Sequence, residues 1–271
     1  MVTRLPLSVF IIAKDEADRI VRPILSVREW ADEVIVVDSG SRDDTMHVAE
    51  KLGARVLFHS WEGYGQQKIF GEGECRNSWI LNLDADEEVT PELAANIQAL
   101  FASGDPKESA FRLRWQMLMP HEDRPLALTP KYRFIRLYDK RRAGFRDSTV
   151  HDSVVVREGA AGEVKGIVLH RCFRNLSHWT GKINYYSDLQ AQDYIAKGRK
   201  PQGLRIICEP FLSFLKSYIL RRYFIYGMDG FVASAQYGYA RMLRLAKARE
   251  LLKEQALLKE RGVQHVQKSE S

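Results

Sequence analysis

The chain lacks the features that mark membrane-spanning, secreted and disulfide-rich proteins. It has no run of about 18 apolar residues, so we expect no transmembrane helix, and its first residues show no signal-peptide cleavage pattern. Its three cysteines, Cys75, Cys172 and Cys208, are odd in number and widely spaced. They predict neither a disulfide framework nor a zinc ligand set, and we expect a reducing compartment.

Acidic residues are scarce toward the carboxyl end. After residue 198 there are 14 Lys and Arg against 6 Asp and Glu, whereas the whole chain carries a net charge of +6. This imbalance indicates a polyanionic partner, and without a nucleic-acid-binding motif we expect that partner not to be nucleic acid. Bulky apolar residues lie among the basic ones, which favours an amphipathic surface on anionic lipid. The alternative, compatible with the first, is a helix pair that packs on the preceding domain with a solvated basic face. The basic residues concerned are Lys216, Arg221, Arg222, Arg241, Arg244, Lys247 and Arg249.

Short β-rich runs alternate with amphipathic segments over the first hundred residues. The runs lie at 7–13, 34–37, 55–59 and 79–84, with helices expected at 17–30, 46–52, about 69–77 and 91–103. This alternation predicts βαβ units and a parallel sheet. Further strands are expected at 111–115, 132–138 and 164–170, and helices from residue 177 onward at 183–196, 204–226 and 231–259. We therefore expect an α/β domain at 1–175, an amphipathic helical region at 176–262 and a disordered tail at 263–271.

The fourth run, Trp-Ile-Leu-Asn-Leu-Asp-Ala-Asp-Glu-Glu-Val at 79–89, ends in closely spaced acidic residues. Open α/β sheets bind ligands at the carboxyl ends of their strands. There, Asp84 and Asp86 are spaced to reach one hard divalent cation, and Mg²⁺ takes one or two carboxylates together with substrate phosphates. The plainer interpretation is an acidic helix N-terminus before Thr90-Pro91.

The second run ends in Asp38-Ser39-Gly40-Ser41-Arg42-Asp43-Asp44-Thr45. An acid at a strand end is well placed to accept hydrogen bonds from a ribose or a base, and we favour that role for Asp38. We interpret Asp44 as a helix cap.

Taken together and in order, these segments resemble glycosyltransferase family 2, and within it the lipopolysaccharide core β-1,4-glucosyltransferases. The matching segments are Ile11–Glu16, Val37–Thr45, Gly63–Lys68, Trp79–Glu87, Val150–Asp152, Tyr194–Gly198 and Gly227–Gly230. The resemblance implies a GT-A fold, that is, a Rossmann-like, mixed but mostly parallel sheet flanked by helices, with a C-terminal helical extension. It covers nearly all of residues 5–250. The family commonly has Asn where this chain has Asp15, and His-Glu where it has His151-Asp152.

The resemblance also implies roles for individual residues. The nucleotide-sugar would be bound by Ala13, Lys14, Glu16, Asp38, Gly40, Lys68, Arg76, Asp84 and Ala85. A divalent metal, Mg²⁺ or Mn²⁺, would be held by Asp86, with His170 as a further metal or diphosphate contact or else a structural histidine. Asp152 would be the catalytic base, with His151 beside it and Glu87 as its competitor; on spacing alone, His151 and Asp152 merely end a strand.

The expected activity is inverting transfer of a hexose, glucose from UDP-glucose, to a lipid-linked saccharide such as the lipopolysaccharide inner core. We expect the enzyme in the cytoplasm, peripheral on the inner face of a bacterial plasma membrane. Alternatives are a family 2 transferase acting on polyprenyl phosphate or another envelope glycan, and a non-catalytic nucleotide-sugar-binding protein. A haloacid-dehalogenase-type phosphatase is disfavoured because Glu88 stands where that motif needs Thr or Val. A sugar-phosphate nucleotidyltransferase would have a Gly-rich loop where Lys14-Asp15-Glu16 stands.

Overall fold

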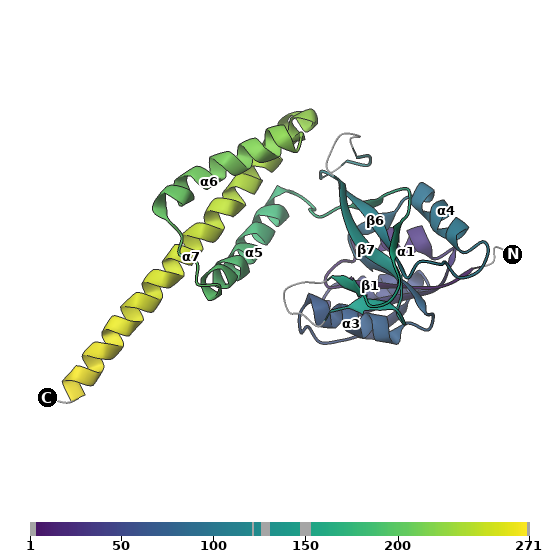
Figure 1. Ribbon diagram of the computed structural model, residues 1–271, viewed down its shortest axis with the longest axis horizontal. Helices are drawn as coiled ribbons and strands as arrows, with labels where there is room; N and C mark the ends of the chain where they lie inside the picture. Colours follow the sequence, from purple (N-terminus) through teal and green to yellow (C-terminus); the bar gives the residue numbers. More distant parts are fainter. Residues whose placement is uncertain (1–3, 121, 126–130, 147–152, 270–271) are drawn as a thin grey trace. The chain divides into compact units, whose positions relative to one another are not determined.

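The computed structural model describes residues 4–120, 122–125, 131–146 and 153–269, with side-chain surroundings as far as residue 259 (Figure 1). The chain forms two compact units. One comprises Met1–Leu118 and Lys131–Cys172, and the other comprises Met119–Pro130 and Phe173–Ser271. The boundary near residue 172 lies close to the change from strands to helices in the sequence.

The first unit is built on a nine-stranded sheet of order β3-β2-β1-β4-β7-β6-β11-β5, with β10 also paired to β6. Strands β1, β2, β3 and β4 are parallel to one another, whereas β7 is antiparallel to both β4 and β6. These pairing directions confirm a mixed, mostly parallel sheet. The strands are β1 (Leu5–Ala13), β2 (Ala31–Asp38), β3 (Arg55–Phe58), β4 (Trp79–Asp84), β5 (Glu87–Val89), β6 (Ala110–Met117), β7 (Lys131–Asp139), β10 (Ala161–Glu163) and β11 (Val168–His170). A separate ribbon pairs β8 (Ala143–Phe145) with β9 (Val154–Val156).

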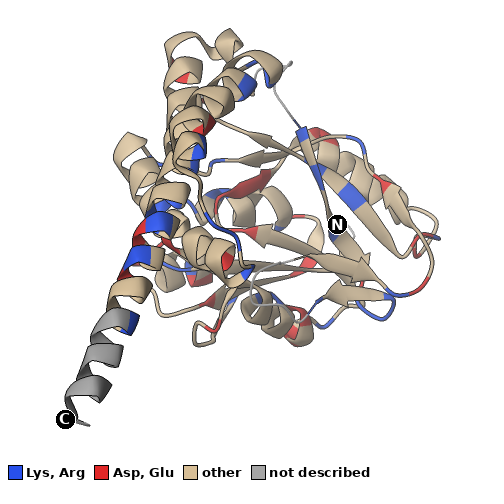
Figure 2. Ribbon diagram, turned by 60° about the vertical axis from the view of Figure 1, so that its left-hand side comes forward, with Lys and Arg blue, Asp and Glu red and all other residues tan. Residues whose placement is uncertain are grey.

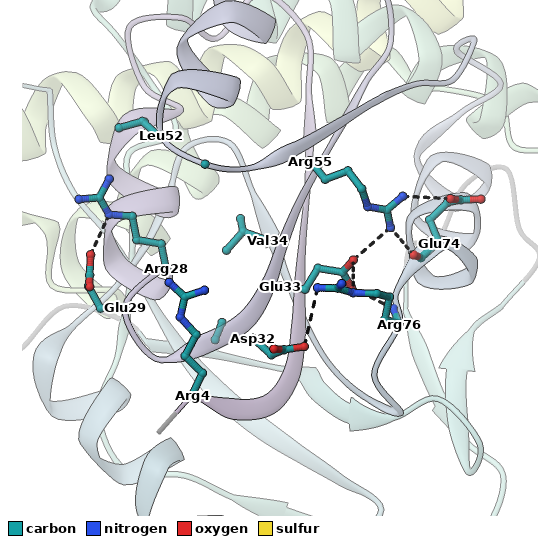
Figure 3. Close-up of a pocket in the computed structure, with 12 residues that line it drawn as sticks. Arg4, Arg28, Glu29, Asp32, Glu33, Val34, Leu52, Arg55, Glu74 and Arg76 are labelled. Atoms are coloured by element: carbon teal, nitrogen blue, oxygen red, sulfur yellow. Dashed lines mark hydrogen bonds and ion pairs between the residues drawn. The ribbon is translucent and has the colours of Figure 1, made fainter. Parts of the chain in front are cut away.

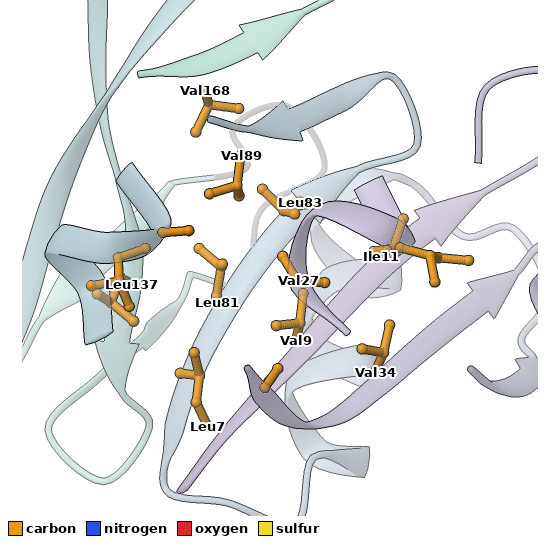
Figure 4. Packing of buried hydrophobic residues seen from close by; sticks show 14 of the residues in the cluster. Leu7, Val9, Ile11, Val27, Val34, Leu81, Leu83, Val89, Leu137 and Val168 are labelled. Carbon is orange, nitrogen blue, oxygen red and sulfur yellow. The ribbon is translucent and has the colours of Figure 1, made fainter. Parts of the chain in front are cut away.

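Both faces of this sheet are buried, which explains why its central strands read as continuous apolar runs. Alternate residues of β1 point to opposite faces: Val9 and Ile11 belong to one core cluster, and Phe10 and Ile12 to the other. Figure 4 shows the first cluster, in which these strands pack with Val27 and their neighbours. That cluster is covered by α1 (Val21–Val27), α2 (Thr45–Lys51) and α4 (Pro91–Leu100), and the second by α3 (Tyr64–Glu74).

Several local features of this unit differ from the sequence prediction; α3, for example, begins at Tyr64 and not at about residue 69. The first helix is shorter than the expected 17–30, and the acidic residues after Asp86 form the strand β5 instead of leading straight into a helix. β5 pairs with β11, so that Glu87 lies opposite His170. The helix start at Thr90 is as expected, since the Thr90 hydroxyl accepts a hydrogen bond from the Leu93 N–H.

The second unit is helical, with α5 (Leu176–Ala196) and α6 (Gly203–Leu215) both packed against the long helix α7 (Gly227–Ser269) (Figure 1). Between α6 and α7 lie a π-helical segment η1 (Lys216–Leu220) and a 3₁₀ segment η2 (Tyr223–Tyr226), with Arg222 in a left-handed conformation between them. The helix expected at 204–226 is thus interrupted, and α7 includes residues 263–269 of the segment expected to be a disordered tail. Among the described residues, no helix combines the length and apolar character needed to cross a membrane.

Candidate functional site

The carboxyl ends of β1, β2 and β4 meet at one edge of the sheet. In the strand register, Ala13 lies beside Asp38 and Ile12 beside Asp84. Three residues that the sequence singled out, Ala13, Asp38 and Asp84, are therefore brought together at the edge where open α/β sheets bind ligands.

The loops that follow β1 and β2 are joined by direct hydrogen bonds. The Asp15 N–H donates to the Ser41 hydroxyl at 2.8 Å, and the Asp15 carboxylate accepts from the Arg42 N–H at 2.7 Å. The Glu16 N–H donates to the Thr45 hydroxyl at 2.8 Å. Asp15 has a positive φ of 54°, a backbone conformation that Asp and Asn tolerate better than other non-glycine residues.

Asp38 holds the second loop together. Its buried carboxylate accepts hydrogen bonds from the N–H groups of Gly40 and Ser41, at 2.8 and 2.9 Å, and from the Ser41 hydroxyl. Gly40 has a φ of 93°, which only glycine adopts readily. Lys14 is exposed at the end of β1, whereas Glu16 is half-buried and accepts a 2.6 Å hydrogen bond from Arg19.

Asp84 is held between two cations from distant parts of the sequence. Lys68 of α3 is fully buried and its Nζ lies 3.0 Å from Asp84 Oδ1, while the Arg136 guanidinium of β7 lies 3.4 Å from Oδ2. Burial alone would raise the pKa of Asp84, but the charges of Lys68 and Arg136 outweigh it and hold that pKa well below its usual range. Arg136 also donates to Asn82 Oδ1 and lies over the Trp115 ring, 5.6 Å from its centre. Asp84 is therefore an ionised carboxylate with a fixed orientation.

Asp86 and His170 form a second pair at the same edge. Asp86 Oδ1 lies 3.4 Å from His170 Nε2, and Asp86 Oδ2 lies 3.5 Å from Arg19 Nη1. Burial raises the pKa of Asp86, but the hydrogen bond and charge of His170, together with the charge of Arg19, outweigh burial and lower that pKa. Burial lowers the pKa of His170, and its contacts with Asp86 and Cys172, whose Sγ is 3.4 Å from Nδ1, raise it to well above its usual value.

The Asp86–His170 pair fits a divalent cation that is completed by ligand phosphates. A carboxylate oxygen and an imidazole nitrogen are both accepted metal ligands, and their 3.4 Å separation lets one ion reach both. Among the described residues, no three His, Cys, Asp or Glu side chains gather into a complete metal-binding cluster. Phosphate oxygens and water would therefore have to complete the coordination, and binding would displace the imidazole proton.

Both carboxylate oxygens of Glu87 accept hydrogen bonds from neighbouring residues. Its side chain is buried, Oε2 accepts from the Asp84 N–H at 3.0 Å, and Oε1 accepts from the Trp115 indole N–H at 2.6 Å. Burial and the neighbouring Asp84 charge raise the pKa of Glu87. These contacts fix the turn that carries Ala85 and Asp86, and Ala85 is itself buried there.

Some predicted site residues are not part of this cluster. The Arg76 side chain is largely exposed and contacts Glu33 at 3.1 Å and Asp32 at 3.8 Å, near the amino end of β2. These residues line a cavity of about 860 Å³ with several other charged side chains, as Figure 3 shows. His151 and Asp152 lie outside the described residues.

Three members of the cluster were not anticipated from the sequence: Arg19, Arg136 and Trp115. Arg136 did carry a signal, because it stands in the apolar run Ile-Arg-Leu-Tyr at 135–138, and a charge buried in a strand needs a partner. Arg19 lies in a polar stretch, and nothing in its neighbours distinguishes it from a surface arginine.

Comparisons with known proteins give a consistent result. Residues 8–154 match the model of the family described as Glycosyl transferase family 2. A Rickettsia bellii protein named "Uncharacterized glycosyltransferase" is 44% identical over 90% of this chain and 86% of its own length. The Rhizobium meliloti "Lipopolysaccharide core biosynthesis glycosyltransferase LpsC" is 30% identical over 86% of this chain and 87% of its own. A structure of glucosyl-3-phosphoglycerate synthase from Mycobacterium tuberculosis with Mn²⁺, UDP and product matches only 41% of this chain and 44% of its own, at 24% identity and a TM-score of 0.36.

Proposed function

The chain belongs to glycosyltransferase family 2 and is a nucleotide-sugar-dependent glycosyltransferase, and we propose that it transfers glucose from UDP-glucose to a lipid-linked saccharide of the lipopolysaccharide inner core type. The observation that carries the proposal is the pair of carboxylates at the end of β4: Asp84 lies between Lys68 and Arg136, and Asp86 lies beside His170. The resemblance to the LpsC protein over most of both chains supports the acceptor class.

The donor would lie across the carboxyl ends of β1, β2 and β4. In this proposal the loops 13–16 and 38–41 border the nucleoside, and their mutual hydrogen bonds keep the pocket formed before the donor arrives. Asp84 is fixed by two cations, so it can accept hydrogen bonds from a ribose or sugar hydroxyl without rotating away. Lys68 and Arg136 at the same place favour a ligand that carries negative charge.

Asp86 and His170 would hold a divalent cation, Mg²⁺ or Mn²⁺, against the donor diphosphate. When bound, such an ion acts as a Lewis acid that neutralises charge on the departing diphosphate. Arg19 supplies a positive charge near the expected diphosphate. It lies 3.5 Å from Asp86 and would limit repulsion between that carboxylate and a phosphate.

The transfer itself needs a base. The acceptor hydroxyl oxygen bonds to the anomeric carbon as the bond from that carbon to the diphosphate oxygen breaks, and the hydroxyl proton passes to a carboxylate. Asp152 is the proposed base, with His151 beside it at the phosphate, the metal or the acceptor. Glu87 is the weaker candidate because both of its oxygens already accept hydrogen bonds from Asp84 and Trp115.

The acceptor class is tested by UDP release. The purified protein is incubated with UDP-glucose and Mn²⁺, and with a lipid-linked inner-core saccharide, a polyprenyl phosphate or no acceptor. The proposal predicts release above the no-acceptor rate only with the saccharide. Release with polyprenyl phosphate alone would assign the enzyme to the other acceptor class. A lack of release with both acceptors, although UDP-glucose binds, would contradict the proposed transfer to either class.

A further inference from the structure

The helix α6 exposes its apolar side. Leu204, Ile207, Phe211 and Leu215 recur at intervals of three or four residues, so they lie along one face of the helix. Their exposed fractions are 73%, 64%, 69% and 49%. Exposed apolar residues continue through η1, η2 and the start of α7, with Ile219, Leu220, Phe224, Met228 and Phe231. A helix face with four exposed large apolar side chains, as on α6, is unusual on a monomeric soluble protein and marks an interaction surface.

The side of α6 that faces α7 has few fully buried side chains. Between residues 203 and 222, all of which the structure describes, only the side chains of Ser213 and Ser217 are buried. Glu209 of α6 forms ion pairs with Arg241 and Arg244 of α7, at 3.4 and 3.8 Å. A water-soluble helical hairpin normally buries most of its large apolar side chains, whereas Leu204, Ile207 and Phe211 of this one are exposed.

Close backbone contacts add to the side-chain packing between these segments, in which Phe214 lies 5.3 Å from Phe231 between ring centres and Ile206 packs against the cluster that contains Leu245. A side chain at Gly238 of α7 would collide with the Pro210 carbonyl oxygen of α6, and one at Gly230 would collide with the Tyr223 carbonyl oxygen. Packing through Gly and Ser is typical of helices surrounded by lipid, where apolar side chains turn outward.

The charge on this hairpin is complementary to anionic lipid. From residue 199 to 228 the chain contains six Lys and Arg against a single acid, Glu209, and Figure 2 colours charged residues by sign. Lys216 and Arg222 are exposed beside the apolar residues. Other basic residues of the region are engaged within the unit, since Arg241 and Arg244 contact Glu209 and Lys247 contacts Asp188 at 2.7 Å.

We propose that the face formed by Leu204, Ile207, Phe211, Leu215, Ile219, Leu220, Phe224, Met228 and Phe231 inserts into the headgroup region of an anionic phospholipid bilayer. We call this set the apolar face. The hairpin lies in the plane of the membrane, its apolar face among the upper acyl chains and Lys216 and Arg222 at the lipid phosphates. Because this surface is defined by the helical unit alone, the proposal does not depend on which sugar is transferred, or on whether transfer occurs.

The first test is flotation of the full-length protein with phosphatidylcholine vesicles, with and without phosphatidylglycerol. We expect binding that requires phosphatidylglycerol. Phe211→Gln and Leu220→Gln should each weaken it about tenfold or more, since each removes a buried apolar group from the bilayer. Leu258→Gln, on α7 outside the apolar face and 68% exposed, is the matched control and should bind as the wild type does. Lys216→Gln should weaken binding to anionic vesicles about fivefold.

The second test uses Cys208, which is exposed on α6. An environment-sensitive fluorophore attached there should shift to shorter wavelength on adding anionic vesicles, and Cys208→Ser protein treated with the same reagent gives the background. Failure of the wild type to float with anionic vesicles would overturn the proposal. So would self-association that Leu220→Gln abolishes in the absence of any vesicle binding, since the face would then bind a second copy of the chain. Vesicle binding without any response to nucleotide would leave this proposal standing and would remove the proposed reaction.

Discussion

The buried ammonium group of Lys68 lies 3.0 Å from the Asp84 carboxylate, joining α3 to the end of β4 across 16 positions of sequence. Lys68 is among the largest fully buried side chains of the protein, and burying a charge is costly unless it is paired. The ion pair therefore links the stability of the sheet edge to the orientation of the Asp84 carboxylate.

Replacing Lys68 by Met should destabilise the fold. The change removes one partner of a buried ion pair and leaves Asp84 with Arg136 alone, so we expect the free energy of unfolding to fall by about 3 kcal/mol in urea titrations. Lys107→Met, at an exposed position of the same unit, is the control and should change it by less than about 0.5 kcal/mol. Equal stability of Lys68→Met and the wild type would show that the pair is not formed in solution.

Arg136 should matter for activity through orientation. Arg136→Lys keeps the charge but removes the planar group that reaches Asn82 and Asp84 together and lies over Trp115. We expect kcat/KM to fall about 100-fold, because a displaced carboxylate no longer positions the donor. Arg133→Lys, three residues earlier on β7 and 55% exposed, is the matched control. A loss of the same size in the control would point to a general effect of the strand.

The acid Glu33, at the amino end of β2, should make stability depend on pH. Burial raises its pKa, but hydrogen bonds from the Arg76 N–H and the Ser8 hydroxyl and the charges of Arg76 and Arg55 lower it below the usual 4.5. A carboxyl whose pKa is depressed by folding stabilises the protein above its unfolded pKa, and this contribution is lost as pH falls through the folded value. Glu33→Gln should therefore be less stable than the wild type by about 1–3 kcal/mol at pH 7.

The difference between the two proteins should shrink as the pH is lowered below about 4.5. The control is Glu29→Gln, whose side chain is 76% exposed and should show little difference at either pH. A gap between wild type and Glu33→Gln that stays constant down to pH 3 would contradict this account.

Asp152→Asn should abolish transfer but not donor binding. Loss of a general base typically lowers kcat about 10²–10⁴-fold, whereas the nucleotide-dependent rise in Tm should persist because Asp84 and Asp86 remain. Glu87→Gln should instead lower stability, since an amide cannot accept through its nitrogen, and should leave in place the acidic limb of the pH–rate profile, where the rate rises as the base ionises. If Glu87→Gln removes that limb and Asp152→Asn does not, the two assignments must be exchanged.

Much of the sheet could be predicted from local pattern alone. The strand at 7–13 appears as β1 (Leu5–Ala13), because a strand buried on both faces leaves an unbroken apolar run. The strand at 132–138 appears as β7 (Lys131–Asp139), which mixes apolar and basic residues and is exposed over its first four positions. β5 could not be predicted in this way. It is a three-residue strand rich in acid, and its pairing with β11 depends on a contact some 80 positions away.

The acids of the site could be predicted from the strand pattern and Lys68 and His170 from the family resemblance, whereas Arg19 and Arg136 were not predicted. Asp84 and Asp86 stand out because they end a buried strand, but their partners come from α3, β7 and the loop after β1, and only the assembled sheet brings these together. The helical region shows a similar limit. The spacing of Leu204, Ile207 and Phe211 predicts an amphipathic helix, but spacing alone does not decide which side of that helix is covered.

The central claim is that Asp86 holds a divalent ion against the diphosphate of a UDP-sugar. The most direct measurement is the thermal shift of the wild type, Asp86→Ala and the exposed-site control Asp105→Asn with UDP-, GDP-, dTDP- and CMP-sugars, with and without Mn²⁺. We predict a rise in Tm with the UDP-sugar only when Mn²⁺ is present, retained in Asp105→Asn and lost in Asp86→Ala. No rise with any nucleotide-sugar in the presence of metal, or a rise that Asp86→Ala retains, would contradict it.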